Sequence, residues 1–171
     1  GLPELEILYI YDEKKGSYYE AKKWAYKYDG NQNLTALTVT DAQTGVIIEN
    51  TLNKYDGNNN KIETAKYHGH SLISTTFYKY DKNKNELESR TIAAGGGCVE
   101  KICNSYDEAG IKIETEIYKN GDDSLAGKII YNKFACPTVI ETYHAGSLLN
   151  TILSTYDGSG NKTEETKITP G

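Results

Sequence analysis

A tyrosine–aspartate dipeptide recurs along the chain at an almost constant interval. It begins at Tyr11, Tyr28, Tyr55, Tyr80, Tyr106 and Tyr156, and Tyr131-Asn132 fills the one gap. From Tyr28 onward the marks lie 25 to 27 residues apart, whereas the first step, from Tyr11 to Tyr28, is 17 residues. A fixed period of this length indicates a tandem repeat. We therefore expect one domain over residues 1–171, with regular repeats over 28–169 and an atypical N-terminal cap unit over 1–27.

Each repeat contains two turns. A second set of marks, beginning at Tyr67, Ile92, Tyr118 and Tyr143, falls about halfway between the Tyr-Asp marks. In the first set, aspartate can accept hydrogen bonds from backbone N–H groups two or three residues on. The fourth position of that turn is glycine or asparagine in several copies, which suits a left-handed residue in a type I turn closed by a bulge. Gln32 and Lys84 fit this position less well.

The segments between the turns alternate like strands. Residues 71–80, SLISTTFYKY, place Leu72, Ser74, Thr76, Tyr78 and Tyr80 on one face. Alternation with turns about every 12 residues predicts an all-β fold and no helix. We expect about 13 strands in an antiparallel up-and-down meander of tandem ~25-residue β-hairpin repeats, forming a curved sheet or a partly rolled sandwich. Pro137 lies inside a unit, where a bulge or an edge position is expected.

The Tyr-Asp turns and the Lys/Thr-Glu strands that follow them resemble the YD repeats of Rhs-type bacterial surface and toxin-shell proteins. The clearest stretches are Tyr156 to Thr166 and Tyr106 to Gly121, and Tyr118-Lys-Asn-Gly121 also resembles MORN-type repeats. In a short domain, the combination looks most like small exported Bacteroides-type repeat proteins of uncharacterised function. The Gly-Arg that follows the Rhs turn is missing and the repeats are few. The resemblance therefore implies no toxin encapsulation and brings no catalytic residues.

Charge and composition narrow the partners. The net charge is −5, and no basic stripe of the kind that binds phosphates is present, so we expect no nucleic-acid partner. No apolar run approaches the ~20 residues of a membrane-spanning helix. The chain starts at Gly1 without methionine or signal peptide, and a processed N-terminus would explain both. We expect export to the periplasm, the outer surface or the medium.

The residues that could bind a metal ion or catalyse a reaction have simpler structural explanations. His68-x-His70 could face one way on a strand, but His68 and His144 share a turn position that also holds Lys119 and Ala93. Asp-x-Asn-x-Asn occurs three times, yet the glycine and glutamate that complete a calcium loop are missing. No nucleophile elbow or cooperating acid pair is present. We expect no catalytic, cofactor-binding or metal-binding residues, no cofactor, and no enzymatic activity.

The tyrosines carry the remaining functional hypothesis. Trp24, Tyr26 and Tyr28 share one face, as do Tyr78 and Tyr80, and cross-strand pairing would stack such rings into a ladder. A buried ladder would be the core, whereas an exposed one would bind sugars or proteins. We expect a non-catalytic secreted or envelope-associated binding or structural module, with a protein or glycan partner. The alternative is a carbohydrate-binding module that uses exposed tyrosines and Trp24. The oligomeric state stays open.

The three cysteines report on sheet geometry. Cys98 and Cys103 fall in one predicted strand, and Cys136 falls in the strand after Tyr131. In a flat meander three strand steps of ~4.8 Å separate them by about 14 Å, beyond the ~4.4–6.8 Å between Cα atoms that a disulfide needs. We therefore predict no bridge between Cys136 and either of the others.

Overall fold

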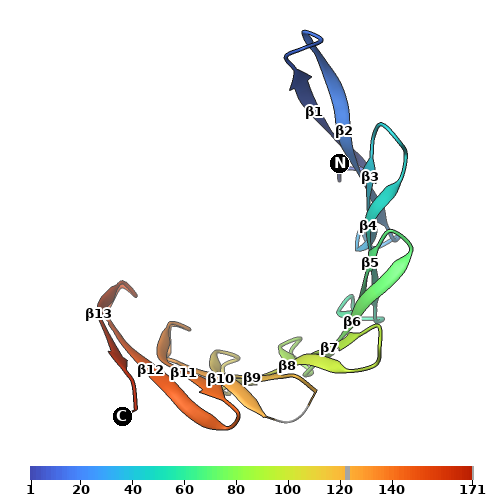
Figure 1. Cartoon of the computed structure of the whole chain (residues 1–171). Helices are drawn as coiled ribbons and strands as arrows, with labels where there is room; N and C mark the ends of the chain where they lie inside the picture. The colour runs from blue at the N-terminus through green and yellow to red at the C-terminus, as the bar shows by residue number, and fades with distance from the viewer. Residues whose placement is uncertain (122–123, 171) are drawn as a thin grey trace. The chain divides into compact units, whose positions relative to one another are not determined.

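The strands follow one another in the sheet in the same order as in the sequence. In the computed structural model, which describes residues 1–121 and 124–170, β1 to β13 are hydrogen-bonded in chain order in one sheet (Figure 1). Every pairing for which partners are given is antiparallel. The up-and-down meander is confirmed. Residue 171, the end of the predicted domain, and residues 122 and 123 of the predicted repeats lie outside the described residues.

The chain divides into two compact units, Gly1–Phe77 and Tyr78–Gly171, which are described separately. The strands that begin in the first unit are β1 (Leu5–Asp12), β2 (Ser17–Tyr28), β3 (Leu34–Asp41), β4 (Ile47–Tyr55), β5 (Lys61–His68) and β6 (Ser71–Tyr80). Those of the second unit are β7 (Glu86–Ala93), β8 (Cys98–Tyr106), β9 (Lys112–Lys119), β10 (Leu125–Tyr131), β11 (Pro137–His144), β12 (Ser147–Tyr156) and β13 (Lys162–Ile168).

The Tyr-Asp turns from Tyr28 onward share one geometry. In the first of them the Gln32 N–H donates to the Asp29 carbonyl at 3.1 Å, and the Asp29 N–H donates to the Asn33 carbonyl at 3.0 Å. The Asp29 carboxylate accepts the N–H groups of Asn31 and Asn33, both at 2.9 Å. The same i to i+3 bond closes each of the other turns. The predicted type I turn closed by a left-handed residue is therefore confirmed.

The fourth turn position is left-handed whatever residue occupies it. Its φ angles are 67° at Gln32, 68° at Lys84 and 57° at Ala135, close to 64° at Asn59 and 79° at Gly110. Gln32 and Lys84 therefore adopt the turn despite their side chains. Register imposed by the flanking strands overrides the local preference of these residues.

The first Tyr-Asp mark does not belong to the same row of turns. Tyr11-Asp12 precedes the β1–β2 turn, and β2 alone separates it from the turn after Tyr28, so the two lie at opposite ends of the strands. Its hydrogen bonds match the β3–β4 turn instead. The Gly16 N–H donates to the Asp12 carbonyl at 2.8 Å, as Gly45 does to Asp41 at 2.9 Å. Grouping Tyr11 with the other marks was wrong. The 17-residue step is one strand and its turn rather than a shortened repeat.

A β-bulge recurs near the start of the second strand of the hairpins. The pairs Lys27–Ala36 and Tyr28–Leu34 leave Thr35 without an opposite residue. Corresponding unpaired residues follow other turns, mostly β-branched ones: Ile48, Ile62, Ile73, Val99, Ile113, Thr138 and Thr163. Bulges increase local twist and fix register. The bulge after the β10–β11 turn lies beside Pro137, which pairs with Tyr131, as predicted for that proline.

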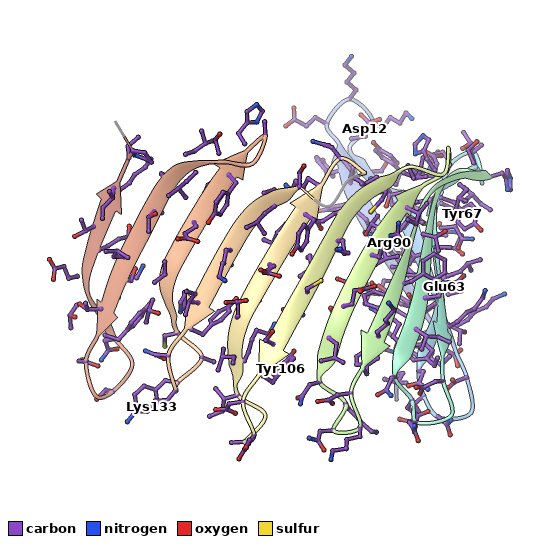
Figure 2. The ribbon with its side chains drawn as sticks, turned by 90° about the horizontal axis from the view of Figure 1, so that it is seen from below. Asp12, Glu63, Tyr67, Arg90, Tyr106 and Lys133 are labelled. Atoms are coloured by element: carbon purple, nitrogen blue, oxygen red, sulfur yellow. The ribbon has the colours of Figure 1, made fainter. Side chains whose placement is uncertain are left out.

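Each unit is a single layer of strands. The given strand contacts join sequence neighbours, so neither unit shows the partly rolled sandwich. Figure 2 shows side chains projecting from the ribbon without a covering layer. The accessible surface is 11115 Å², against about 8,400 Å² expected for a compact monomer of this mass. Among the described residues no large side chain is less than 2% exposed. Both faces of the strands therefore stay partly in contact with water.

Candidate binding surfaces

The predicted aromatic platform on β2 is half-buried. Trp24 lies opposite Val39, and Tyr26 lies opposite Leu37 on β3. The Tyr26 hydroxyl donates to the Glu6 carboxylate at 2.9 Å, and this bond, with some desolvation, raises the pKa of Tyr26. The Tyr28 hydroxyl donates to the Pro3 carbonyl at 3.1 Å. These two tyrosines are therefore occupied in joining β2 to the segment around β1.

The mark tyrosines from Tyr28 onward do not lie on neighbouring strands, as a continuous cross-strand aromatic ladder would require. From Tyr28 onward the marks end every second strand, and the residues paired with them on the strand between are not aromatic: Leu34, Lys61, Lys112, Pro137 and Lys162. Two strand steps are about 9.6 Å, farther than the 4.5–7 Å at which rings pair. Tyr78 and Tyr80, on β6 in the second unit, are likewise half-buried. Mark tyrosines on successive hairpins are therefore too far apart to stack directly on one another.

Three mark tyrosines, Tyr55, Tyr106 and Tyr156, instead join their hairpin to the preceding one. On β4, the Tyr55 hydroxyl and the Asn53 amide both donate to the Leu34 carbonyl, at 3.0 and 2.9 Å. In the second unit, the Tyr106 hydroxyl and the Asn104 amide donate to the Glu86 carbonyl, both at 3.0 Å. The accepting residue directly follows the previous Tyr-Asp turn. It lies beyond the last residue pair that joins β3 to β4, or β7 to β8. Burial raises the pKa of Tyr55 and of Tyr106.

Asparagine extends this link into a buried polar pair. The Thr115 hydroxyl donates to the Asn104 amide oxygen at 2.8 Å, and Thr64 does the same to Asn53 at 2.8 Å. Thr64, Thr115 and Asn104 are 6%, 6% and 8% exposed. Sequence reasoning missed this pair. The available signal was Asn-x-Tyr-Asp, which occurs at Asn53 and Asn104 with threonine on the facing strand.

The most exposed aromatic cluster lies on the β1–β2 hairpin. Tyr9, Tyr11 and Tyr18 are 53%, 49% and 71% exposed, and the rings of Tyr11 and Tyr18 lie 5.0 Å apart between centroids. Tyr9 donates to the Glu20 carboxylate at 3.2 Å. Glu20 also pairs with Lys23 at 2.7 Å, which lowers the pKa of that carboxyl. Exposed rings beside hydrogen-bonding groups thus gather at this hairpin, away from the half-buried Trp24.

Polar side chains alternate in charge on the second unit. Lys128 pairs with Glu114 at 2.7 Å, and this contact raises the pKa of Lys128. On the adjacent strands the Tyr118 hydroxyl donates to Glu116 at 2.8 Å, and the Tyr143 hydroxyl donates to Glu141 at 2.7 Å. The Lys128–Glu114 pair therefore joins two strands, as expected for a solvated sheet surface, whereas each phenol bonds to a glutamate two residues earlier on its own strand.

Two hollows open on the described surface. One of about 360 Å³ is lined by Glu49, Thr51, Lys66, Tyr67, His68 and Ile73. Another of about 190 Å³ lies where Gly127, which has no side chain, faces Ile117 and Thr142. In the first hollow Glu49 lies opposite His68, and both are exposed.

The metal-binding candidates are placed as follows. His68 and His144 end their strands, His70 lies in the following turn, and all three are exposed. In the Asp-x-Asn-x-Asn turns the asparagine amide donates to the aspartate, as Asn33 does to Asp29 at 3.0 Å. That donation lowers the pKa of Asp29 and occupies a carboxylate oxygen that calcium would need. Over residues 1–121 and 124–170, no three His, Cys, Asp or Glu side chains form a metal-binding group.

The cysteines lie at three separate places. Cys98 and Cys103 are on β8, whereas Cys136 precedes β11 as the last residue of a turn rather than a strand residue. All three are free thiols, and burial raises the pKa of Cys103. In strand order β9 and β10 lie between β8 and β11, so the spacing behind the disulfide prediction holds. In Figure 2 Tyr106, at the end of β8, and Lys133, beside Cys136, mark the same end of the second unit.

Comparisons with known proteins identify no family for this chain. No protein-family model matches the chain, and no curated protein matches it. Among solved structures, the crystal structure of TcdB2-TccC3 without its hypervariable C-terminal region matches at a TM-score of 0.48 and 11% identity. The match covers 95% of this chain and spans 12% of that chain. No helix among the described residues is long and apolar enough to cross a membrane.

Proposed function

We propose that this chain is a non-catalytic binding or structural module, exported to the cell envelope or beyond, that presents sheet surface to a protein or glycan partner. The observation that carries the proposal is the single layer of strands, with water on both faces of each unit. An enzyme of this size usually concentrates its chemistry in a pocket that excludes water. The described hollows are instead lined by exposed or half-buried strand residues, and none of their lining residues is fully buried.

The binding proposal is supported by how the polar groups are used. The buried polar side chains Asn104 and Thr115 hydrogen-bond one another, and the Tyr106 hydroxyl is taken by a backbone carbonyl. These groups therefore hold the hairpins together and leave ligand contact to exposed side chains. Export rests on the resemblance to small exported repeat proteins, and fractionation of the producing cell tests it.

A carbohydrate ligand is the second candidate, and the exposed cluster of Tyr9, Tyr11 and Tyr18 favours it. Phenol rings offer apolar faces for sugar C–H groups, while Glu20 and Lys23 offer hydrogen-bonding partners. The half-buried residues Trp24, Tyr26 and Tyr28 are less available than this cluster. Glycan binding would thus use the β1–β2 hairpin through Tyr9, Tyr11 and Tyr18, whereas Trp24, which lies opposite Glu6, is on the other face of the hairpin.

A glycan array probed with the purified chain tests both candidates. If sugars are the ligand, Tyr18→Ala should weaken binding at least tenfold, because it removes the most exposed ring. Phe134→Ala is the matched control, since Phe134 is 51% exposed in a turn of the second unit. Absence of glycan binding together with capture of a defined protein partner would leave the module proposal standing and end the carbohydrate one. Turnover of an arrayed glycan would overturn the non-catalytic proposal.

A further inference from the structure

The two edges of the sheet have opposite character. β1 and β13 are the terminal strands in hydrogen-bonding order. On β1 five large apolar or aromatic side chains are exposed by 42–55%: Leu5, Leu8, Tyr9, Ile10 and Tyr11. β13 reads KTEETKI, with charge on four of its seven residues. Charged side chains are how natural sheets prevent an edge from pairing with another chain. β13 is protected in this way, and β1 is not.

The open side of β1 has free backbone groups in a regular pattern. The Tyr26 N–H donates to the Glu4 carbonyl at 3.0 Å, and the Gly16 N–H donates to the Asp12 carbonyl at 2.8 Å. Even-numbered residues of β1 therefore direct their backbone toward β2, because bonding alternates along an antiparallel strand. Leu5, Ile7, Tyr9 and Tyr11 direct their N–H and C=O groups to the open edge.

We propose that β1 pairs antiparallel with β1 of a second copy of this chain, which continues the sheet across a two-fold axis. In each hydrogen-bonded pair both residues must direct their backbone groups to the open edge. Of the registers that meet this condition, the one that pairs aliphatic with aromatic residues places Ile7 opposite Tyr9 of the second copy and Leu5 opposite Tyr11. Leu8 then meets its own equivalent on the axis. This register forms about eight backbone hydrogen bonds. It places aliphatic residues opposite aromatic ones, which are favourable cross-strand pairs.

The sequence of β1 fits a second copy better than it fits β13. In the Leu8-centred register Glu6 lies opposite Ile10, so the acidic side chain of Glu6 does not face an acidic residue of the second copy. Pairing β1 with β13 would instead place apolar side chains beside Lys162, Glu164, Glu165 and Lys167, and it would extend without closing. A two-fold pairing uses the same strand twice and closes at two copies. The dimer goes beyond the proposed binding function and leaves both sheet faces open.

The exposed area of the β1 side chains sets the expected affinity of the dimer. Five side chains exposed by 42–55% offer on the order of 100 Å² each, or about 1,000 Å² over both copies. Interfaces below about 1,200 Å² are weak and transient. We therefore expect a dissociation constant on the order of 10–100 µM. The dimer should be half-formed in a concentration range accessible to sedimentation.

Sedimentation equilibrium of the purified chain from about 1 to 500 µM tests the proposal. The expected result is a reversible monomer–dimer equilibrium. Ile7→Pro removes an N–H that faces the open edge and is not used by β2, so the dimer should be lost while the far-ultraviolet circular dichroism is kept. Leu8→Lys places like charges together on the axis and should weaken dimerisation at least tenfold. It keeps the test valid if the proline variant does not fold.

The matched control lies on the other edge. Ile168, on β13, is 49% exposed, and Ile168→Lys should leave the equilibrium unchanged. A chain that stays monomeric to 500 µM would overturn the proposal. A dimer that survives both β1 substitutions would overturn it too, as would open-ended growth that Ile168→Lys abolishes.

Discussion

The buried pair Asn104–Thr115 gives a quantitative test of how the hairpins are joined. Asn104 donates to the Glu86 carbonyl at 3.0 Å and accepts from Thr115 at 2.8 Å. Asn104→Ile removes both bonds, each contributing about 1 kcal/mol. The Thr115 hydroxyl would keep only its 3.3 Å contact with Tyr131. We expect the variant to lose about 2 kcal/mol of unfolding free energy.

The next hairpin supplies the matched control. Asn104 lies two residues before the mark Tyr106, and Thr115 lies nine residues after it. The residues at the same offsets from the next mark, Tyr131, are Ile129 and Ile140, which pair directly. Thr115→Ile alone should cost about 1–3 kcal/mol, because it leaves the buried Asn104 amide oxygen without its donor. The double variant reproduces the natural isoleucine pair. Since replacing both partners of a buried hydrogen bond by apolar groups is nearly neutral, it should recover most of the loss.

Urea and thermal unfolding of the wild type, two single variants and double variant form a complete cycle. Each single variant should lower the melting temperature by about 2–4 °C per kcal/mol lost. The coupling between the two positions should reach at least about 1 kcal/mol. Strictly additive losses would refute the idea that the two side chains act as a pair. Single losses below about 0.5 kcal/mol would refute the stabilising role of the buried bonds.

Four further predictions follow from the turns and thiols. Lys84→Gly should raise stability by about 0.5–1 kcal/mol, measured by urea unfolding, because Lys84 is held at φ 68°; an unchanged or lower stability would contradict this reasoning. The hydrogen bond from the Asn85 amide lowers the pKa of Asp81 in the folded state. The stability that this bond contributes is complete above the unfolded pKa of about 3.9 and is lost as pH falls toward the lower folded pKa. Asp81→Asn should therefore flatten the fall of unfolding free energy at acidic pH, and an unchanged fall would contradict the assignment. Added calcium or chelator should leave the melting temperature unchanged, and a rise of several degrees with calcium would reveal a site. Mass spectrometry of the unreduced protein should find no Cys103–Cys136 bridge, since finding one would require strands three steps apart to meet.

Several elements were readable in advance because they depend on local chemistry. Aspartate at the first turn position and a left-handed residue at the fourth act within five residues, so the turn type followed from composition and spacing. Alternation likewise predicted antiparallel strands. Lys84 shows the limit of local preference, because the strands on either side force its φ positive. The bulge residue, such as Thr35, also escaped prediction, since only the facing strand shows that it has no partner.

The candidate surfaces were less predictable. Trp24 and Tyr26 were correctly placed on one face of a strand, but their exposure depends on what the neighbouring strand brings beside them, here Val39 and Leu37. Tyr18 carried no distinguishing pattern, and its 71% exposure follows from its place on the terminal hairpin. Tyr55 looked like one ring of a ladder. Its hydroxyl instead reaches the Leu34 carbonyl on the adjacent hairpin.

The sequence by itself determined the period, the turns, the strand order and the absence of a helix over the residues that the structure describes, because each depends on interactions between residues close in the chain. Only the tertiary structure decided that each unit is a single layer and that three of the mark tyrosines join hairpins. The partners of Tyr106 and Asn104 lie 20 and 18 residues away, and their bonds require a register that the bulges set. The contrast between an apolar β1 and a charged β13 was visible in the letters. It acquired meaning once the strand order made these two the edges, because only an edge leaves its backbone donors and acceptors unpaired.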